Sequence, residues 1–190
     1  MDRKFLQTIG DWQRKKIKEP LMIIGARQVG KTWCIREFCR KNMPDYVYIN
    51  LEERPDIASV FEGNLEPEGL LRQISQILGK RITEDIPLIL DEIQVSERAI
   101  TSLKYFCESE RNYRIICAGS LLGVKLKRFS SSFPVGKVRI EHMYPMDFEE
   151  FLYACGEELL AEGIRDAYNQ KSPLAEGIHE KALQLYHDYL

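Results

Sequence analysis

Short apolar runs and amphipathic segments alternate along most of this chain. Runs that are apolar or rich in β-favouring residues predict strands at 21–24, 46–51, 87–92, 113–119 and 137–141. Apolar residues that recur every three or four positions predict helices at about 3–16, 31–39, 56–62, 66–79, 96–107 and 146–155. Apolar strands that alternate with helices are typical of a parallel sheet covered on both faces. We therefore predict an α/β fold, a doubly wound three-layer α/β/α sandwich that binds ligands at the carboxyl ends of its strands.

The pattern changes after about residue 156. Short amphipathic helices are predicted there, interrupted by Gly156, Gly163, Pro173 and Gly177, and the chain ends inside such a pattern. A length of 190 residues leaves room for one α/β domain and part of another. We expect a domain at 1–155 and a helical segment at 156–190, which would be the start of a truncated or disordered C-terminal region.

The segment after the first predicted strand reads GARQVGKT, which has the spacing G-x-x-x-x-G-K-[ST] of a P-loop. Its glycines permit a tight turn and a close approach to a ligand, and its N–H groups would converge on phosphate oxygens at the start of a helix. Lys31 would contact the β- and γ-phosphates, and the Thr32 hydroxyl would bind Mg²⁺. The predicted nucleotide-binding residues are Gly25, Ala26, Arg27, Gln28, Val29, Gly30, Lys31, Thr32 and Trp33.

Two further strands end in residues that a phosphate site needs. The third strand ends in Asp91 and Glu92. Asp91 is predicted to hold Mg²⁺ and Glu92 to polarise an attacking water, although two surface acids would give the same pattern. The fourth strand runs into Ser120, which could hydrogen-bond the water or the γ-phosphate, or could serve only as a turn or helix-capping residue.

Four segments in this order, GARQVGKT, LILDEIQ, AGSLLG and YPMDFEEF, resemble the prokaryotic AAA+-type P-loop ATPases. Those ATP-binding proteins carry a C-terminal domain of poorly known function. The resemblance spans roughly residues 1–155 and implies a P-loop fold with the sheet order 5-1-4-3-2. It also implies Lys31 and Thr32 on the nucleotide and Mg²⁺, Glu92 as catalytic base and Ser120 as a γ-phosphate sensor. Lys137 stands where many relatives have arginine, and a lysine lacks the bidentate fork of arginine.

Composition and charge indicate which partners the chain favours. The net charge is -2 with a pI of about 6.0, so the overall charge does not favour nucleic acid or an anionic membrane. Two basic clusters, at 14–18 and 125–128, are interpreted as solvated surfaces, and a DNA contact is the weaker alternative. Five scattered cysteines, the lack of a secretory pattern and the absence of a long apolar run lead us to expect a cytoplasmic protein with no membrane segment.

The sequence thus predicts an enzyme that binds ATP and Mg²⁺ and hydrolyses ATP. Its expected ligands are ATP and ADP, and its expected partner is either a second copy of the chain or another protein. One alternative is a nucleotide-binding switch with little turnover of its own. A small-molecule kinase is a further alternative, but a water-polarising Glu92 would serve no purpose in a site that must exclude water.

Overall fold

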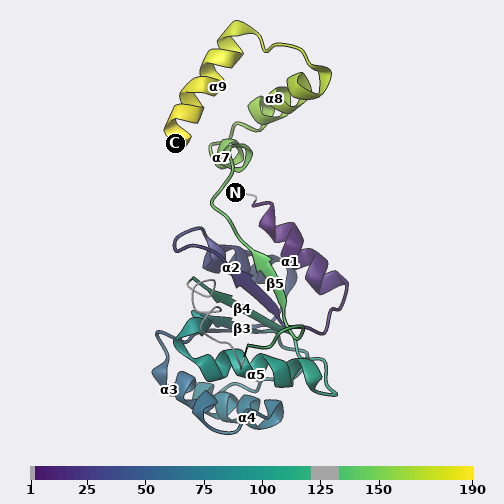
Figure 1. Cartoon of the computed structure of the whole chain (residues 1–190), viewed down its shortest axis with the longest axis vertical. Coiled ribbons are helices and arrows are strands. Elements are labelled where there is room, and N and C mark those ends of the chain that lie inside the picture. Colours follow the sequence, from purple (N-terminus) through teal and green to yellow (C-terminus); the bar gives the residue numbers. More distant parts are fainter. Residues whose placement is uncertain (1–2, 121–132) are drawn as a thin grey trace. The chain divides into compact units, whose positions relative to one another are not determined.

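The computed structural model describes residues 3–120 and 133–190, and its centre is a five-stranded parallel sheet (Figure 1). The strand order is β2-β3-β4-β1-β5, and all four neighbouring pairs are parallel. The strands are β1 (Leu21–Ile24), β2 (Val47–Asn50), β3 (Leu88–Asp91), β4 (Ile115–Gly119) and β5 (Arg139–His142). Read from the other edge, this is the predicted order 5-1-4-3-2, so the predicted fold is confirmed.

Helices cover both faces of this sheet (Figure 1). The helix α1 (Phe5–Arg14) precedes β1. The elements between the strands are α2 (Lys31–Asn42), α3 (Pro55–Ala58), α4 (Pro67–Leu78), α5 (Glu97–Glu108) and the 3₁₀ helices η1 (Ser59–Glu62) and η2 (Ile93–Val95). The single helix predicted at 56–62 is therefore one α-helical turn followed by a 3₁₀ turn. Ser96 caps α5 as its residue type suggests, since its hydroxyl accepts a hydrogen bond from the Ala99 N–H at 3.1 Å.

The alternation of side chains along each strand divides the core into two layers. Every second strand residue packs with α3, α4 and α5 in one buried cluster, to which β1 contributes Met22 and Ile24 and β2 contributes Val47 and Ile49. The intervening residues of β1, β3 and β4 are also buried, as are the inward residues of α1 and α2 on the other side of the sheet. A sheet buried on both faces explains why its strands read as nearly continuous apolar runs.

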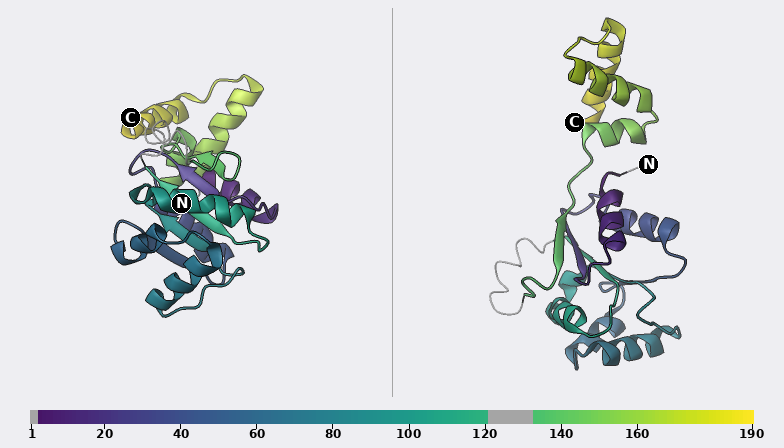
Figure 2. Two further views of the ribbon diagram at one scale, coloured as in Figure 1. Left: turned by 60° about the horizontal axis from the view of Figure 1, so that its bottom comes forward. Right: turned by 90° about the vertical axis from the view of Figure 1, so that its right-hand side faces the viewer.

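The chain forms two compact units, residues 7–144 and residues 1–6 with 145–190. The second unit contains α7 (Phe148–Ala154), α8 (Glu158–Gln170) and α9 (Glu176–Tyr189), which Figure 2 shows grouped together. The sequence analysis places a boundary at 155, whereas α7 packs with the helices that follow it. Gly163 and Gly177 lie inside α8 and α9, so the prediction that they interrupt short helices was wrong. An isolated glycine weakens a helix by only about 1 kcal/mol, which packing outweighs.

A buried ion pair holds the start of the chain to α7 within this second unit. The Arg3 Nε donates to Glu150 Oε1 at 3.1 Å, and the Lys4 N–H donates to the same oxygen at 2.8 Å. Glu150 Oε2 also accepts from the Asp147 N–H, while the Asp147 side chain accepts from the Glu150 N–H, which makes a reciprocal capping box. One carboxylate therefore serves an ion pair and a helix cap at once.

None of the helices in the described residues is long and apolar enough to cross a membrane. The second basic cluster of the sequence analysis, Lys125, Lys127 and Arg128, lies outside the described residues, as does the Leu121-Leu122-Gly123 part of the AGSLLG segment.

Gly25 directly follows β1, where the chain passes very close to the residue after β5. A Cβ placed on Gly25 would lie 2.2 Å from the carbonyl oxygen of Met143. Gly25→Ala is therefore expected to lower the free energy of unfolding by at least about 1–3 kcal/mol, because backbone must move to make room. Urea denaturation followed by circular dichroism measures this. The control is Gly10→Ala within α1, where the new methyl group meets only Phe38 at 3.6 Å and stability should stay equal or rise by up to about 1 kcal/mol. Equal stability of Gly25→Ala and wild type would contradict the close approach.

Glu150→Ala removes the carboxylate that binds Arg3 and caps α7. We expect a loss of about 3 kcal/mol in the stability of the helical unit, because the charge of Arg3 stays buried after its carboxylate is gone. Glu162→Ala on α8, an exposed position, is the matched control and should change stability by less than about 0.5 kcal/mol. The same urea titration distinguishes them, and similar midpoints for the two variants would show that the buried pair contributes little.

Candidate functional site

The loop between β1 and α2 contains two residues in the left-handed backbone conformation, which few residue types adopt readily. Gly30 has a φ of 94° and Gln28 a φ of 64°, both in the left-handed region. Such a turn leads directly into α2, whose first N–H groups lack partners within the helix and carry its positive dipole end. The loop therefore has the form of an anion-binding turn, as the sequence predicts.

Lys31 is buried at the first position of α2, with 6% of its surface exposed. Its Nζ donates to the carbonyl oxygens of Gly25 at 3.0 Å and Ala26 at 2.6 Å, so the side chain is folded back over its own loop. Burial lowers the pKa of its ammonium group, while the negative charges of Glu92 and Asp91 oppose this shift. An ammonium has three donors, and two are used here, which leaves one for a ligand.

Asp91 is nearly inaccessible, with 2% of its surface exposed at the end of β3. Its Oδ2 accepts two hydrogen bonds, from the Thr32 hydroxyl at 2.6 Å and from the Tyr48 hydroxyl at 2.7 Å. Its Oδ1 accepts a third from the Glu92 N–H at 3.0 Å. The predicted pair of Thr32 and Asp91 is therefore in direct contact, although the two residues are far apart in the sequence.

Glu92 has an unusual backbone conformation, with a φ of 51° and a ψ of 41° immediately before η2. Its Oε2 accepts a hydrogen bond from Nε2 of Gln94, a buried residue two positions later. Glutamate rarely adopts a positive φ, so the surrounding structure must hold it there. This turn directs the side chain of Glu92 to the cleft described next.

A cleft of about 530 Å³ lies at the carboxyl ends of the strands. It is lined by Arg27, Gln28, Gly30, Lys31, Thr32, Trp33, Glu52, Glu92 and Ser120. The Ser120 Oγ is buried and has no hydrogen-bond partner in the part of the chain that the structure describes. An orphaned buried hydroxyl at the wall of a cleft is a group that a bound ligand or water could satisfy. Of the other predicted residues, Gly25 and Ala26 contact Lys31, and Val29 is buried.

Two residues of this region were missed by the sequence analysis. Glu52 follows β2 and lines the cleft, and Tyr48 lies within β2 and binds Asp91. The position of Glu52, just beyond a strand's carboxyl end, was a signal that could have found it. Tyr48 is one of several aromatic residues in a strand, and nothing in its local sequence separates it from a core residue.

The donors in this cleft suit a hard cation bound together with phosphate. A threonine hydroxyl and carboxylate oxygens are ligands that Mg²⁺ takes, and Mg²⁺ is usually held by one or two protein groups plus phosphates and waters. Consistent with so few protein ligands, residues 3–120 and 133–190 contain no cluster of three or more His, Cys, Asp or Glu side chains that could hold a metal alone.

Lys137, which occupies the position where many of the resembled relatives have arginine, forms an ion pair with another part of the same unit. Its Nζ lies 3.1 Å from Glu108 Oε1 at the end of α5. It is absent from the residues that line the cleft. Lys137 therefore does not supply a cationic group to this cleft in the structure.

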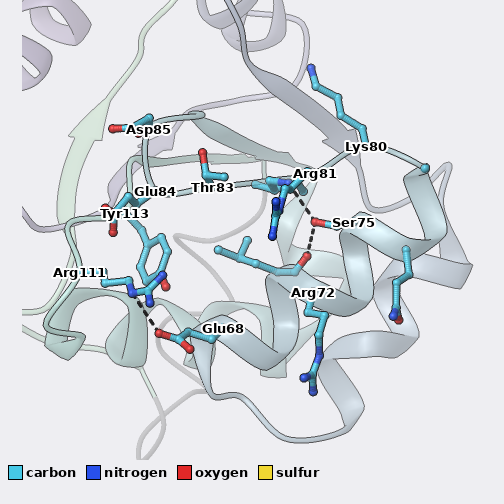
Figure 3. Close-up of a pocket in the computed structure, with 14 residues that line it drawn as sticks. Glu68, Arg72, Ser75, Lys80, Arg81, Thr83, Glu84, Asp85, Arg111 and Tyr113 are labelled. Atoms are coloured by element: carbon cyan, nitrogen blue, oxygen red, sulfur yellow. Dashed lines mark hydrogen bonds and ion pairs between the residues drawn. The ribbon is translucent and has the colours of Figure 1, made fainter.

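A second and larger hollow, of about 740 Å³, lies at the opposite edge of the sheet (Figure 3). Its lining residues come from α4, from its first turn to its last, and from the segments just before β3 and β4, where parallel strands begin. Two of its cationic residues form ion pairs: Arg111 lies 3.0 Å from Glu68, which also lines the hollow, and Lys80 lies 2.6 Å from Asp45, which does not. None of the predicted phosphate-binding residues reaches it, so the smaller cleft is the candidate site.

Comparisons with solved structures agree with the fold. The Walker-type ATPase PABY2304 of Pyrococcus abyssi has a TM-score of 0.53 and 18% identity over 95% of this chain and 62% of its own. The ORC1 protein of Aeropyrum pernix, solved with DNA, has a TM-score of 0.55 and 11% identity over 95% and 64%. The ORC2 protein of the same organism, solved as ADPNP and ADP complexes, has a TM-score of 0.52 and 13% identity over 95% and 66%.

This chain thus spans less than two thirds of the length of each of these proteins, and such low identities establish the fold alone. No curated protein matches the chain. The family model described as an AAA domain, in contrast, matches residues 17–152, from the approach to β1 through most of α7. Because that match covers well over half of the chain, this protein belongs to the AAA domain family of P-loop ATPases.

Proposed function

We propose that this chain binds ATP with Mg²⁺ and hydrolyses it to ADP and phosphate. The observation that carries the proposal is the cleft itself, in which Lys31, Thr32, Glu92 and Ser120 meet although they come from three separate segments. A phosphate-binding turn alone supports only nucleotide binding. The addition of a carboxylate at the cleft wall supports the transfer of the γ-phosphoryl group to water.

The phosphates would bind at the loop between β1 and α2. Backbone N–H groups of the loop and of the first turn of α2 would surround the phosphate oxygens, with the helix dipole favouring negative charge. The third donor of the Lys31 ammonium would reach the β- and γ-oxygens, and its bonds to Gly25 and Ala26 keep it in place. These groups would also stabilise charge that develops on the γ-phosphoryl in the transition state.

Mg²⁺ would be held by the Thr32 hydroxyl and by Asp91, directly or through bound water. The contact between these two side chains at 2.6 Å fits a shared cation site, since both present hard oxygens. When bound, the metal would supply positive charge that offsets part of the charge of the phosphates.

Glu92 would orient the attacking water and accept its proton, while Ser120 would hydrogen-bond the water or the γ-phosphate. Gln94 holds the Glu92 carboxylate by a hydrogen bond, so the orientation of Glu92 depends on this neighbour. The Ser120 Oγ is buried and has no hydrogen-bond partner among residues 3–120 and 133–190, so a ligand oxygen or water in the cleft would satisfy it.

A nucleotide-binding switch with little turnover is the second candidate, and two observations favour it. The Glu92 carboxylate is engaged by Gln94, and Lys137 pairs with Glu108 rather than facing the cleft. P-loop enzymes often receive an arginine from a neighbouring subunit, which raises turnover about 10³–10⁵-fold. Hydrolysis per chain that increases with protein concentration would indicate such a neighbour. A small-molecule kinase is disfavoured by Glu92, and phosphate release without an added acceptor would exclude it.

The partners implied by this proposal are ATP, ADP and either a second copy or another protein. We do not include DNA, because a net charge of -2 does not favour it. The DNA bound in the structure of the Aeropyrum pernix ORC1 protein is a partner of that protein. Kinship with prokaryotic members that carry a C-terminal domain stays a prediction.

Lys31→Ala removes the ammonium group at the phosphate loop. We expect binding of ATP to fall below detection in isothermal titration calorimetry, because the loop loses its one buried cation beside the phosphates. Lys80→Ala is the control. It changes an exposed lysine near the amino ends of the strands, away from the cleft, and should bind ATP as the wild type does. Tight ATP binding by Lys31→Ala would overturn the nucleotide assignment.

Glu92→Gln keeps the shape of the side chain but cannot accept a proton. We expect nucleotide affinity to change by less than about 3-fold, within the scatter of a single neutral contact. Phosphate release should fall by about 10²–10⁴-fold. Glu97→Gln, an exposed position in the first turn of α5, should leave both quantities unchanged. Equal turnover by wild type and Glu92→Gln would remove Glu92 from the chemistry.

A further inference from the structure

We propose that Tyr48 is a positioning residue for Mg²⁺, acting through the Asp91 carboxylate, and that Arg36 holds Tyr48 in place. This inference rests on the proposed function of the same site. Neither residue belongs to the P-loop or to the Asp91-Glu92 pair, and neither lines the cleft. The role follows from contacts that the sheet and α2 impose.

The Asp91 carboxylate has almost no acceptor capacity left. Two carboxylate oxygens offer about four acceptor sites. Thr32 and Tyr48 occupy those of Oδ2, at 2.6 Å and 2.7 Å, and the Glu92 N–H occupies one on Oδ1. Among the described residues, the remaining acceptor site is on Oδ1, where Asp91 would face Mg²⁺ or its water without losing a hydrogen bond. Tyr48 thus fixes which oxygen of Asp91 is available.

Position in the sheet explains why Tyr48 can do this. β2 is the immediate neighbour of β3, and Asn50 pairs with Asp91 in the register. Val47 and Ile49 point into the core layer below the sheet, so the side chain of Tyr48 lies on the opposite face, which is the face of α2. Asp91 is 2% exposed, and water therefore cannot readily replace a donor that leaves.

Two residues of α2 contact the pair formed by Tyr48 and Asp91. Thr32 and Arg36 are four residues apart and lie on one face of the helix. Thr32 binds Asp91, and the Arg36 guanidinium lies 4.1 Å from the centre of the Tyr48 ring. A cation over an aromatic face is attracted by the ring's quadrupole, and this restricts the ring. The helix that begins at the phosphate loop therefore also orients the tyrosine.

Tyr48 is the donor in its hydrogen bond with Asp91. Burial raises the pKa of its hydroxyl, and the hydrogen bond to Asp91 raises it further, whereas Arg36 opposes the shift. The hydroxyl donates its hydrogen bond to a carboxylate oxygen, which accepts it at 2.7 Å. It is neither a base nor a metal ligand in this proposal.

Removing the hydroxyl should lower the affinity for Mg²⁺ and leave the binding of the phosphates unchanged. Tyr48→Phe keeps the ring, its packing and its contact with Arg36, but Oδ2 of a buried carboxylate then has one donor in place of two. Partners that orient metal ligands typically change metal affinity by about 10–100-fold when removed. Lys31 and the loop between β1 and α2 are unaffected, so nucleotide binding without metal should stay the same.

The experiment measures how much Mg²⁺ improves the binding of a non-hydrolysable ATP analogue. Calorimetry gives Kd in EDTA and in saturating Mg²⁺ for the wild type, Tyr48→Phe and the control Tyr46→Phe, a neighbouring tyrosine that does not contact Asp91. We expect the ratio of Kd in EDTA to Kd in Mg²⁺ to fall by about 10-fold or more in Tyr48→Phe and to stay at the wild-type value in Tyr46→Phe. Arg36→Gln, which keeps the hydroxyl, should lower the ratio by a smaller factor. Circular dichroism confirms that each variant is folded.

The outcomes separate this inference from the proposed function. No binding by the wild type, or binding that Mg²⁺ does not improve, overturns the proposed function itself. A wild type that depends on Mg²⁺ beside a Tyr48→Phe variant with the same ratio overturns the role of Tyr48. Equal weakening of Tyr48→Phe in EDTA and in Mg²⁺ would show a general structural role, which also overturns it.

Discussion

The buried Asp91 carboxylate is the constraint on which the site depends. A charged group with 2% of its surface exposed needs donors from the protein, and it takes them from α2, from β2 and from the residue that follows it. Those three hydrogen bonds fix the start of α2 against the end of β3. The phosphate loop that leads into α2 is thereby held at the carboxyl edge of the sheet, beside Glu92 and Ser120.

Much of this arrangement could be predicted from the chain, because it depends on local pattern. The phosphate loop, the acidic end of β3 and the apolar strands are all continuous in sequence, and the strand order followed from a family resemblance rather than from the residues. The partners of these groups could not be predicted in the same way. Tyr48 reaches Asp91 only because β2 lies beside β3, and the fold of Lys31 over Gly25 and Ala26 depends on loop backbone angles.

The helical unit shows the limit of reading glycines as breaks. Gly163 and Gly177 lie within helices, and α7 belongs with α8 and α9 because its apolar side chains pack there. Leu152 joins Leu160, Ala161 and Ala182 in one small core. Periodicity indicated helices in this part of the chain, but which helices pack together is decided by contacts between residues distant in sequence.

The close approach at Gly25 also determines how this position can evolve. The atom that a new methyl group would meet is the carbonyl oxygen of Met143, which belongs to the backbone and is the same whatever side chain stands there. A compensating substitution at 143 therefore cannot make room. Any lineage that loses this glycine must rebuild the pairing of β1 with the residues that follow β5, so second-site suppressors are expected to be scarce and to lie in the backbone path rather than in side-chain volume.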